Sequence, residues 1–445
     1  MHILRGTSGE LRGRFLRLSG PNIASNLLVP LASAIDIALL GHLAEVQDLA
    51  GVALGAILFD YVFWTFGFLR MATTGLTAQA RGRGDLTGDL TGERLVVWRG
   101  LSIAAAAGLS ILLLRGPLGS LGFSLMQGGE ALHEVAGDYY RWRILGAPFT
   151  LANYVLLGWL LGREESGRAL IMSAVGHGTN IVLDVLFIGG MGLGAAGAGA
   201  ATAISQVVMF ACAIGMGGAA LRPPMQRQFI DQLLDRAALA AFFSLSRDIM
   251  IRTLLLVSTF AVFTNLAASM GTTVLAATAI LRQVVIVAAW FIDGYAFAVE
   301  SLVGVFHGSR ESSMLRDTLR IAMNWAMGTT VLLVLFSVLI PGPLFGLLTD
   351  KPELLEVVMR YRWWLIPVLV FGAPAYILDG YFLGITSGRT LRVAMFWSTL
   401  LGFVPLAALA AWRGDADLLW ASLAAFMLAR TITLGRRAWA TLPVV

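Results

Sequence analysis

The stretch GWLLGREESGR at residues 158–168 returns as GYFLGITSGR at residues 380–389, half the chain later. A Tyr-Arg-Trp step precedes both copies, at residues 140–142 and at residues 361–363. Internal repetition has to be identified early, because it decides the architecture of the whole chain. The repeat predicts two halves that are built on the same plan.

The composition places this chain in a membrane. With 445 residues, 57% of them apolar and 13% charged, and a mean hydropathy of +0.77, it is too apolar for a soluble protein of its size. Apolar runs of about 20 residues, each long enough to cross a hydrocarbon core of about 30 Å, recur along the chain. The breaks between them predict twelve crossings, at roughly 15–40, 49–80, 95–115, 134–162, 168–189, 194–220, 237–269, 273–306, 318–340, 354–385, 391–412 and 416–436. We therefore expect an all-α polytopic membrane protein.

Each half of the repeat holds six of the predicted helices. Trp64 of the second crossing aligns with Trp290 of the eighth at nearly the same spacing. An even number of helices gives both copies one orientation, so the repeats are parallel and the binding region is expected between them near the midplane. The sequence thus predicts an amino-terminal lobe at 1–220, a cytoplasmic linker at 221–236 and a carboxyl-terminal lobe at 237–445.

Basic residues predict how the chain is oriented in the membrane. The arginines of the N-terminus and of alternate loops include Arg81, Arg163, Arg310 and Arg389. The opposite loops are nearly bare of basic residues until Lys351. The positive-inside rule then places both termini in the cytoplasm, for a protein of the cell inner (plasma) membrane. The formal net charge of +5 comes mostly from this fringe, so we expect lipid around the chain and no nucleic-acid partner.

Several kinds of chemistry find no support in the sequence. Cys212 is the single cysteine, which excludes an internal disulfide and a cysteine-based metal site. At membrane depth we find no His-x-x-x-His or His-Glu pattern and no credible Ser-His pair, so the chain is not expected to be an enzyme or to need a cofactor. Nothing in the sequence requires more than a monomer.

Glycines recur where helices are expected to pack closely. The segment GLGAAG at 192–197 matches a dinucleotide-binding pattern, but no strand precedes it and it falls in a tight turn between two crossings. We interpret it as a packing and turn element. The repeated pairs Gly158/Gly162 and Gly380/Gly384 have the small-x-x-x-small spacing of packed membrane helices.

The first crossing, PNIASNLLVPLASAIDIALLGHL at residues 21–43, contains one carboxylate, Asp36. A charge at that depth costs about 2.5 to 3.5 kcal/mol on insertion scales, so an acid there is a functional-site hypothesis by default. The alternative is an Asp paired with a basic residue on a neighbouring helix.

A polar cluster is predicted around this acid. Asn180 and Asp184 on the fifth crossing are four residues apart and project from one helical face. With Asp36 and with Thr202 on the next crossing, they offer two carboxylates, an amide oxygen and a hydroxyl, which suit a proton or a small cation such as Na⁺. The alternative is a hydrogen-bonded knot that only holds the lobe together.

The carboxyl-terminal half carries charges of both signs. Asp248 and Arg252 are spaced for a pair along one helix, and Arg282, Asp293 and Glu300 fall on one stripe of the eighth crossing. A structural ion-pair network and a role in coupling both remain open. The secondary candidates for coupling are Asp379, Asp293, Glu300 and Arg70.

Several long runs carry a family resemblance. VPLASAIDIALLGHL at 29–43, NIVLDVLF at 180–187, SRDIMIRTLLL at 246–256 and DGYAFAVESLVG at 293–304 resemble the DinF-like branch of the multidrug and toxic compound extrusion (MATE) transporters. The resemblance implies a V-shaped pair of six-helix lobes. It also implies export of organic cations and other lipophilic compounds in exchange for protons or Na⁺.

The resemblance also assigns roles to residues. The coupling acid of that family matches Asp36, and its amino-lobe polar cluster matches the three other residues of the predicted cluster, Asn180, Asp184 and Thr202. Pro21 matches the proline at which the first helix bends. Another branch has a cation site in the carboxyl lobe around an acid that Asp379 resembles, although the mixed charges here depart from that branch.

Physical chemistry suggests how such a cluster would couple two fluxes. Burial in an apolar lobe favours the neutral form of a carboxylic acid, so proton uptake by Asp36 is expected. A neutral Asp36 no longer attracts a cationic compound, so the proton and the compound compete and exchange by alternating access. Pro21 and Pro30 lack an amide donor and weaken the first helix, which makes it the element expected to rearrange.

One alternative function stays open at this point. A lipid-linked oligosaccharide flippase of the same superfamily would bind an anionic diphosphate and would need a basic cavity. Arg70, Arg247 and Arg282 are the residues that could supply it.

Overall fold

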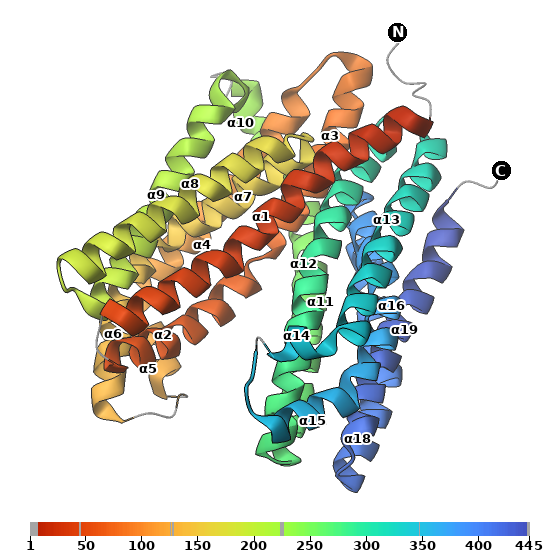
Figure 1. The fold of residues 1–445 in the computed structure, drawn as a ribbon. Helices are drawn as coiled ribbons and strands as arrows, with labels where there is room; N and C mark the ends of the chain where they lie inside the picture. The colour runs from red at the N-terminus through yellow and green to blue at the C-terminus, as the bar shows by residue number, and fades with distance from the viewer. Residues whose placement is uncertain are drawn as a thin grey trace. The chain divides into compact units, whose positions relative to one another are not determined.

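The computed structural model describes residues 8–43, 46–124, 126, 129–222, 227–346 and 348–442, and these residues form helices and no strand (Figure 1). Twelve helical spans in this part of the chain are long and apolar enough to cross a membrane. They begin with Gly9–His42 and end with Ala416–Thr441. The prediction of an all-α protein with twelve crossings is therefore confirmed.

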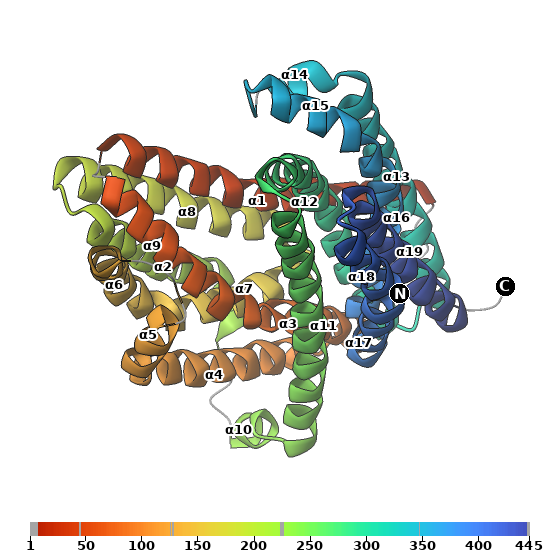
Figure 2. The same ribbon diagram turned by 90° about the horizontal axis from the view of Figure 1, so that it is seen from below.

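The helices of the first half alternate long crossings with short connecting pieces. They are α1 (Ser8–Leu43), α2 (Val46–Thr65), α3 (Phe68–Thr87), α4 (Thr91–Leu113), α5 (Arg115–Ser124), α6 (Glu130–Arg143), η1 (Ile144–Gly146), α7 (Ala147–Gly162), α8 (Ser166–Asp184), η2 (Val185–Gly190), α9 (Gly194–Gly217), η3 (Gly218–Leu221) and α10 (Arg227–Leu233). Within this half α9 packs against α6 and α8, and α7 packs against α3 and α4 (Figure 2).

The second half follows the same order of elements. Its helices are α11 (Arg236–Ser269), α12 (Thr272–Gly308), α13 (Ser312–Leu339), α14 (Pro341–Gly346), α15 (Pro352–Tyr361), η4 (Arg362–Trp364), α16 (Leu365–Gly384), α17 (Gly388–Trp397), η5 (Ser398–Phe403), α18 (Val404–Arg413) and α19 (Ala416–Thr441). The short segments η1 and η4 precede equivalent helices, and η2 and η5 are both π-helical. Since π-helical segments are rare, their recurrence at matching places supports the predicted repeat.

The chain divides by its contacts into two compact units. The amino-terminal unit is Ala24–Phe243, and the carboxyl-terminal unit is Ser244–Val445 together with Met1–Ile23. The start of α1 therefore belongs to the carboxyl-terminal unit, whereas the sequence places it in the first lobe. Phe15 stacks on Tyr295 with ring centroids 5.9 Å apart, which ties this segment to α12. The predicted linker 221–236 falls within the amino-terminal unit.

Helix α1 contains both prolines of the first crossing. It stays helical from Ser8 to Leu43, through Pro21 and Pro30. Each proline removes one backbone hydrogen bond from the helix interior, so two turns of α1 are weaker than the rest. The division between the two units falls between Ile23 and Ala24, two residues after Pro21.

The turns that end α7 and α16 are built alike. The equivalent backbone hydrogen bonds are Glu165 N–H to Leu160 O (2.9 Å) and Ser387 N–H to Phe382 O (2.8 Å). In both turns a non-glycine residue adopts a left-handed conformation, Glu164 with φ 60° and Thr386 with φ 53°. That conformation closes the end of a helix and costs a non-glycine residue about 1 to 2 kcal/mol, so the shared exception confirms the repeat.

Repeated glycines allow two pairs of helices to touch. A Cβ on Gly158 would lie 2.4 Å from the carbonyl oxygen of Arg70, and one on Gly380 would lie 2.4 Å from that of Ala296. The second glycine of each copy is similarly close, Gly162 to Thr74 O (2.6 Å) and Gly384 to Glu300 O (2.7 Å). No side chain fits at such distances, so α7 packs directly on α3 and α16 on α12. The packing interpretation of these glycines is confirmed.

The GLGAAG segment is a turn between two crossings, as predicted. Gly192 and Gly194 have φ values of 66° and 48°, a conformation that glycine adopts without strain. Asp48 accepts a hydrogen bond at 3.0 Å from the backbone N–H of Ala195, in the first turn of α9. A carboxylate at this position stabilises the start of a helix.

Candidate functional site

Three residues of the predicted cluster meet inside the amino-terminal unit. Asn180 Nδ2 donates a hydrogen bond of 2.8 Å to Asp184 Oδ2, and both side chains are buried on α8. Asp36 of α1 is half-buried, and its carboxyl group lies within hydrogen-bonding reach of Asp184. The i, i+4 spacing on α8 therefore places the amide beside one acid, and α1 supplies the second acid.

Each of the two acids has an oxygen to which no described residue donates a hydrogen bond. Asp36 Oδ1 and Asp184 Oδ1 are buried, and neither has a hydrogen-bond donor among the described residues. A buried oxygen without a donor is costly, so a proton or a cation is the natural partner. Both suit this donor set, since a carboxylic acid can donate across the pair and carboxylates are good ligands for a small hard cation.

Thr202 belongs to the same unit but has a local partner. Its hydroxyl donates to the carbonyl oxygen of Ala198, one turn back on α9, at 2.9 Å. The hydroxyl oxygen keeps lone pairs that can accept a hydrogen bond or bind a cation. A role for Thr202 stays a prediction, as it does for Asp36, Asn180 and Asp184.

A cation beside the acids is the main feature of this unit that the sequence interpretation missed. Arg143, near the end of α6, donates a hydrogen bond to the hydroxyl of Tyr139 and lies over the ring of Phe59, 4.7 Å from its centroid. Its charge acts on Asp36 and on Asp60 of α2. Arg143 is therefore a positive charge that acts on two acids of the amino-terminal unit.

A sequence signal for this cation exists. Arg143 lies inside the predicted crossing 134–162, where an ionisable residue is a functional-site candidate for the same reason as Asp36. It directly follows the Tyr-Arg-Trp step of the repeat. Because that step marks the internal copy, Arg143 is easily overlooked as a site residue.

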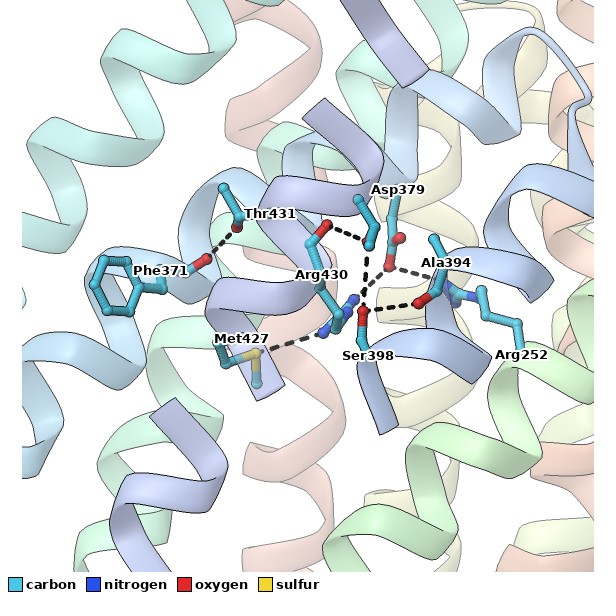
Figure 3. Close-up of polar contacts among 9 residues, drawn as sticks. Arg252, Phe371, Asp379, Ala394, Ser398, Met427, Arg430 and Thr431 are labelled. Carbon is cyan, nitrogen blue, oxygen red and sulfur yellow. Dashed lines mark hydrogen bonds and ion pairs between the residues drawn. The ribbon is translucent and has the colours of Figure 1, made fainter. Parts of the chain in front are cut away.

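In the carboxyl-terminal unit Asp379 lies between two arginines (Figure 3). Its Oδ2 accepts a hydrogen bond of 2.7 Å from Arg252 Nη1 of α11 and one of 2.6 Å from Arg430 Nη2 of α19. All three side chains are buried. Because two guanidinium groups already pair with this carboxylate, it is not free to bind a coupling ion. The contacts therefore favour the structural ion-pair network over the coupling role for Asp379.

Arg430 completes this cluster, and the sequence interpretation missed it as well. It is 1% exposed and lies over the rings of Tyr376, at 5.2 Å, and of Phe426, at 5.6 Å. Aromatic faces stabilise a guanidinium that has lost its water. The signal is an arginine in the middle of the apolar last crossing, but its partner lies 51 residues away and no spacing rule identifies it.

Two charges of α11 form ion pairs with other helices. Asp248 forms an ion pair of 2.9 Å with Arg392 of α17, and Arg247 of α11 lies 3.5 Å from the same carboxylate oxygen. Arg252 pairs with Asp379 on α16. The spacing of Asp248 and Arg252 predicts a pair along α11, whereas Arg252 pairs with α16, and Asp248 pairs with Arg392 of α17 and with its neighbour Arg247.

The other charged candidates occupy separate places. Arg282 donates to Thr264 at 2.9 Å, Glu300 of α12 is fully buried, and Asp293 exerts its charge on Tyr376 beside the Arg430 cluster. Arg70 of α3 is buried, and its positive charge interacts electrostatically with Tyr154. Arg247 is largely exposed. The three arginines considered for a basic cavity therefore lie on three helices in three different surroundings.

The chain is similar in sequence to a family model and to known proteins. The family model MatE matches residues 21–186 and 249–408. DNA damage-inducible protein F of Escherichia coli (strain K12) is 36% identical over 429 residues, which cover 95% of this chain and 91% of that protein. Probable multidrug resistance protein NorM of Pseudomonas putida is 27% identical over 79% of this chain and 76% of its own length.

Solved structures share the fold at lower identity. A MOP superfamily transporter from Pyrococcus furiosus gives a TM-score of 0.83 at 21% identity, covering 99% of this chain and 98% of that one. The MATE transporter VcmN of Vibrio cholerae in its bent form gives a TM-score of 0.84 at 20% identity, with 97% and 98% covered. The similarity extends over nearly the whole of each chain.

Proposed function

This chain belongs to the MatE family of multidrug and toxic compound extrusion transporters, and on that premise we propose that it is a secondary active antiporter. It exports organic cations and lipophilic compounds in exchange for protons or Na⁺. It does so in the inner (plasma) membrane with both termini in the cytoplasm. The protein is a transporter and not an enzyme.

The observation that carries the proposal is a pair of interacting acids, Asp36 and Asp184, each of which has a buried oxygen with no hydrogen-bond donor among the described residues. Two carboxylates this close cannot both be ionised in an apolar surrounding without a counter-charge. The pair therefore holds a proton or a cation in its resting state. It binds and releases that ion as one unit, with the Asn180 amide holding Asp184 in place.

Exchange follows from competition for the charge of this pair. A protonated pair has lost charge and attracts a cationic compound weakly, whereas the deprotonated pair attracts it strongly. Binding of the compound then favours release of the proton, and binding of the proton favours release of the compound. This reciprocity is required by linkage between two ligands of one site.

Arg143 limits how strongly the acids attract a cation. Its guanidinium is fixed over Phe59 and by Tyr139, so its charge stays in place when a compound arrives. It supplies part of the counter-charge that Asp36 and Asp60 need. We assign Arg143 the role of a built-in competitor that keeps cationic compounds exchangeable.

Helix α1 is the element that we expect to move between states. It carries Asp36 in the amino-terminal unit, and it is weakened at Pro21, two residues before its chain passes into that unit. We expect a change in the charge of Asp36 to change the contacts that α1 makes beyond its weakened turn at Pro21. Pro21 is thus proposed as the hinge.

Gradient-driven efflux from proteoliposomes tests the function. Purified protein is reconstituted with a cationic fluorescent dye, and either a pH gradient or a Na⁺ gradient is imposed separately. We expect one of the two gradients to drive dye movement, and that gradient identifies the coupling ion. Dye binding without movement under either gradient would contradict antiport and would describe a binding protein instead.

A further inference from the structure

A groove in the carboxyl-terminal unit lies between the start of α1 and the middle of α13. Its volume is about 580 Å³, within the roughly 300 to 1,000 Å³ typical of small-ligand sites. Its lining residues are Gly9, Arg12, Ile321, Asn324, Trp325 and Gly328. The four from α13 are spaced three and four apart, so they form one face of that helix.

The polar groups of this groove gather at one end. The guanidinium of Arg12 lies over the ring of Trp325, 5.4 Å from its centroid. The side chains of Arg12 and Asn324 are both exposed. Arg320, one turn before Asn324 on the same face, is exposed as well. Within the groove a guanidinium, an amide and an indole are therefore available to an anionic group, and Arg320 adds a second positive charge nearby.

Beyond Gly328 the same face of α13 is apolar. Its exposed residues include Val331, Leu332, Leu335, Phe336 and Leu339. From Asn324 to Leu335 the helix advances about 16 Å at about 1.5 Å per residue, close to half of a hydrocarbon core of about 30 Å. The polar end and the apolar stripe thus match the headgroup and the acyl depth of one leaflet.

We infer that this groove binds an anionic phospholipid, with its phosphate on Arg12 and Asn324 and an acyl chain along α13. Trp325 fits that position, because tryptophan prefers the boundary between headgroups and hydrocarbon. Gly328 leaves the chain room, since a Cβ placed there would have no neighbour within 4 Å. The lipid would bridge α1 and α13 and so stabilise the segment of α1 that packs in this unit.

Lipid binding to the full-length protein in detergent tests the inference. The probes are fluorescent phosphatidylglycerol and phosphatidylcholine with identical chains, titrated against wild type, Arg12→Gln and Asn324→Leu. A basic residue at an anionic membrane surface changes lipid affinity roughly fivefold. We expect phosphatidylglycerol to bind wild type more tightly than phosphatidylcholine, and Arg12→Gln to weaken the anionic lipid alone by about that factor.

Arg17→Gln is the matched control. Arg17 is exposed on the same helix and carries the same charge, but it does not line the groove. Equal losses in Arg12→Gln and Arg17→Gln would mean general attraction to a basic surface and would overturn the site. Equal affinity of wild type for the two lipids would overturn it as well. Displacement of the lipid by inorganic phosphate would identify a soluble-anion site instead and also refute the proposal.

Discussion

Asp36→Asn is expected to reduce gradient-driven dye efflux to the background of protein-free liposomes, with the protein still folded. Asn has nearly the volume of Asp but cannot take up or release a proton near neutral pH. The variant leaves Asp184 and its hydrogen bond from Asn180 in place. The pair can then no longer change its charge as a unit. Efflux is therefore no longer coupled to the opposing ion flux. Efflux is measured in proteoliposomes with equal amounts of reconstituted protein.

The control for this variant is Asp89→Asn, the same substitution outside the membrane. Asp89 lies in the turn between α3 and α4, where hydrogen bonds from Thr91 hold the pKa of its carboxyl below the usual value. It therefore stays ionised through the pH range of the assay and has no part in coupling. Wild-type efflux in Asp36→Asn would remove this residue from the mechanism, and a loss in Asp89→Asn would show that the assay reports something other than coupling.

Asp379→Asn is expected to lower the stability of the protein strongly. The substitution removes the carboxylate charge that pairs with Arg252 and Arg430, and Arg430 is fully buried. Breaking a buried ion pair from one side costs about 3 to 5 kcal/mol, because a charge is left without compensation in a low-dielectric interior. The free energy of unfolding, measured by denaturant titration in detergent, should fall by that amount.

Asp417→Asn serves as the reference for this second variant. Asp417 pairs with Arg360 at 3.4 Å, but both side chains are well exposed. An exposed ion pair is worth about 0 to 1 kcal/mol, so this change should be small. If Asp379→Asn kept wild-type stability and lost only transport, Asp379 would be a coupling residue and the structural role would be refuted.

The fold could be predicted from the sequence because it is set by local features. Membrane-length apolar runs fix the twelve crossings, and the repeated glycines fix the contacts of α7 with α3 and of α16 with α12. The spacing of Asn180 and Asp184 predicts one helical face, and their hydrogen bond confirms that they meet. Each of these inferences depends on residues close in sequence or on an internal copy.

The rest depends on contacts between distant parts of the chain. Asp379 meets Arg252 across 127 residues and Arg430 across 51, and neither separation has a periodicity that reveals it. The packing of residues 8–23 with the second half is likewise a tertiary outcome. Arg143 acts on Asp36 through the fold, not through spacing. A charged residue inside an apolar crossing can be identified from the sequence, but the distant residue with which it pairs cannot.

Proton release on binding tests most directly the claim that Asp36 and Asp184 form one titrating pair. Calorimetric titration of the purified protein with a cationic dye, in two buffers of different ionisation enthalpy near neutral pH, counts the protons released. For proton coupling we expect about one proton per dye bound in wild type and none in Asp36→Asn, with binding retained. Equal proton release from the two proteins would contradict the account.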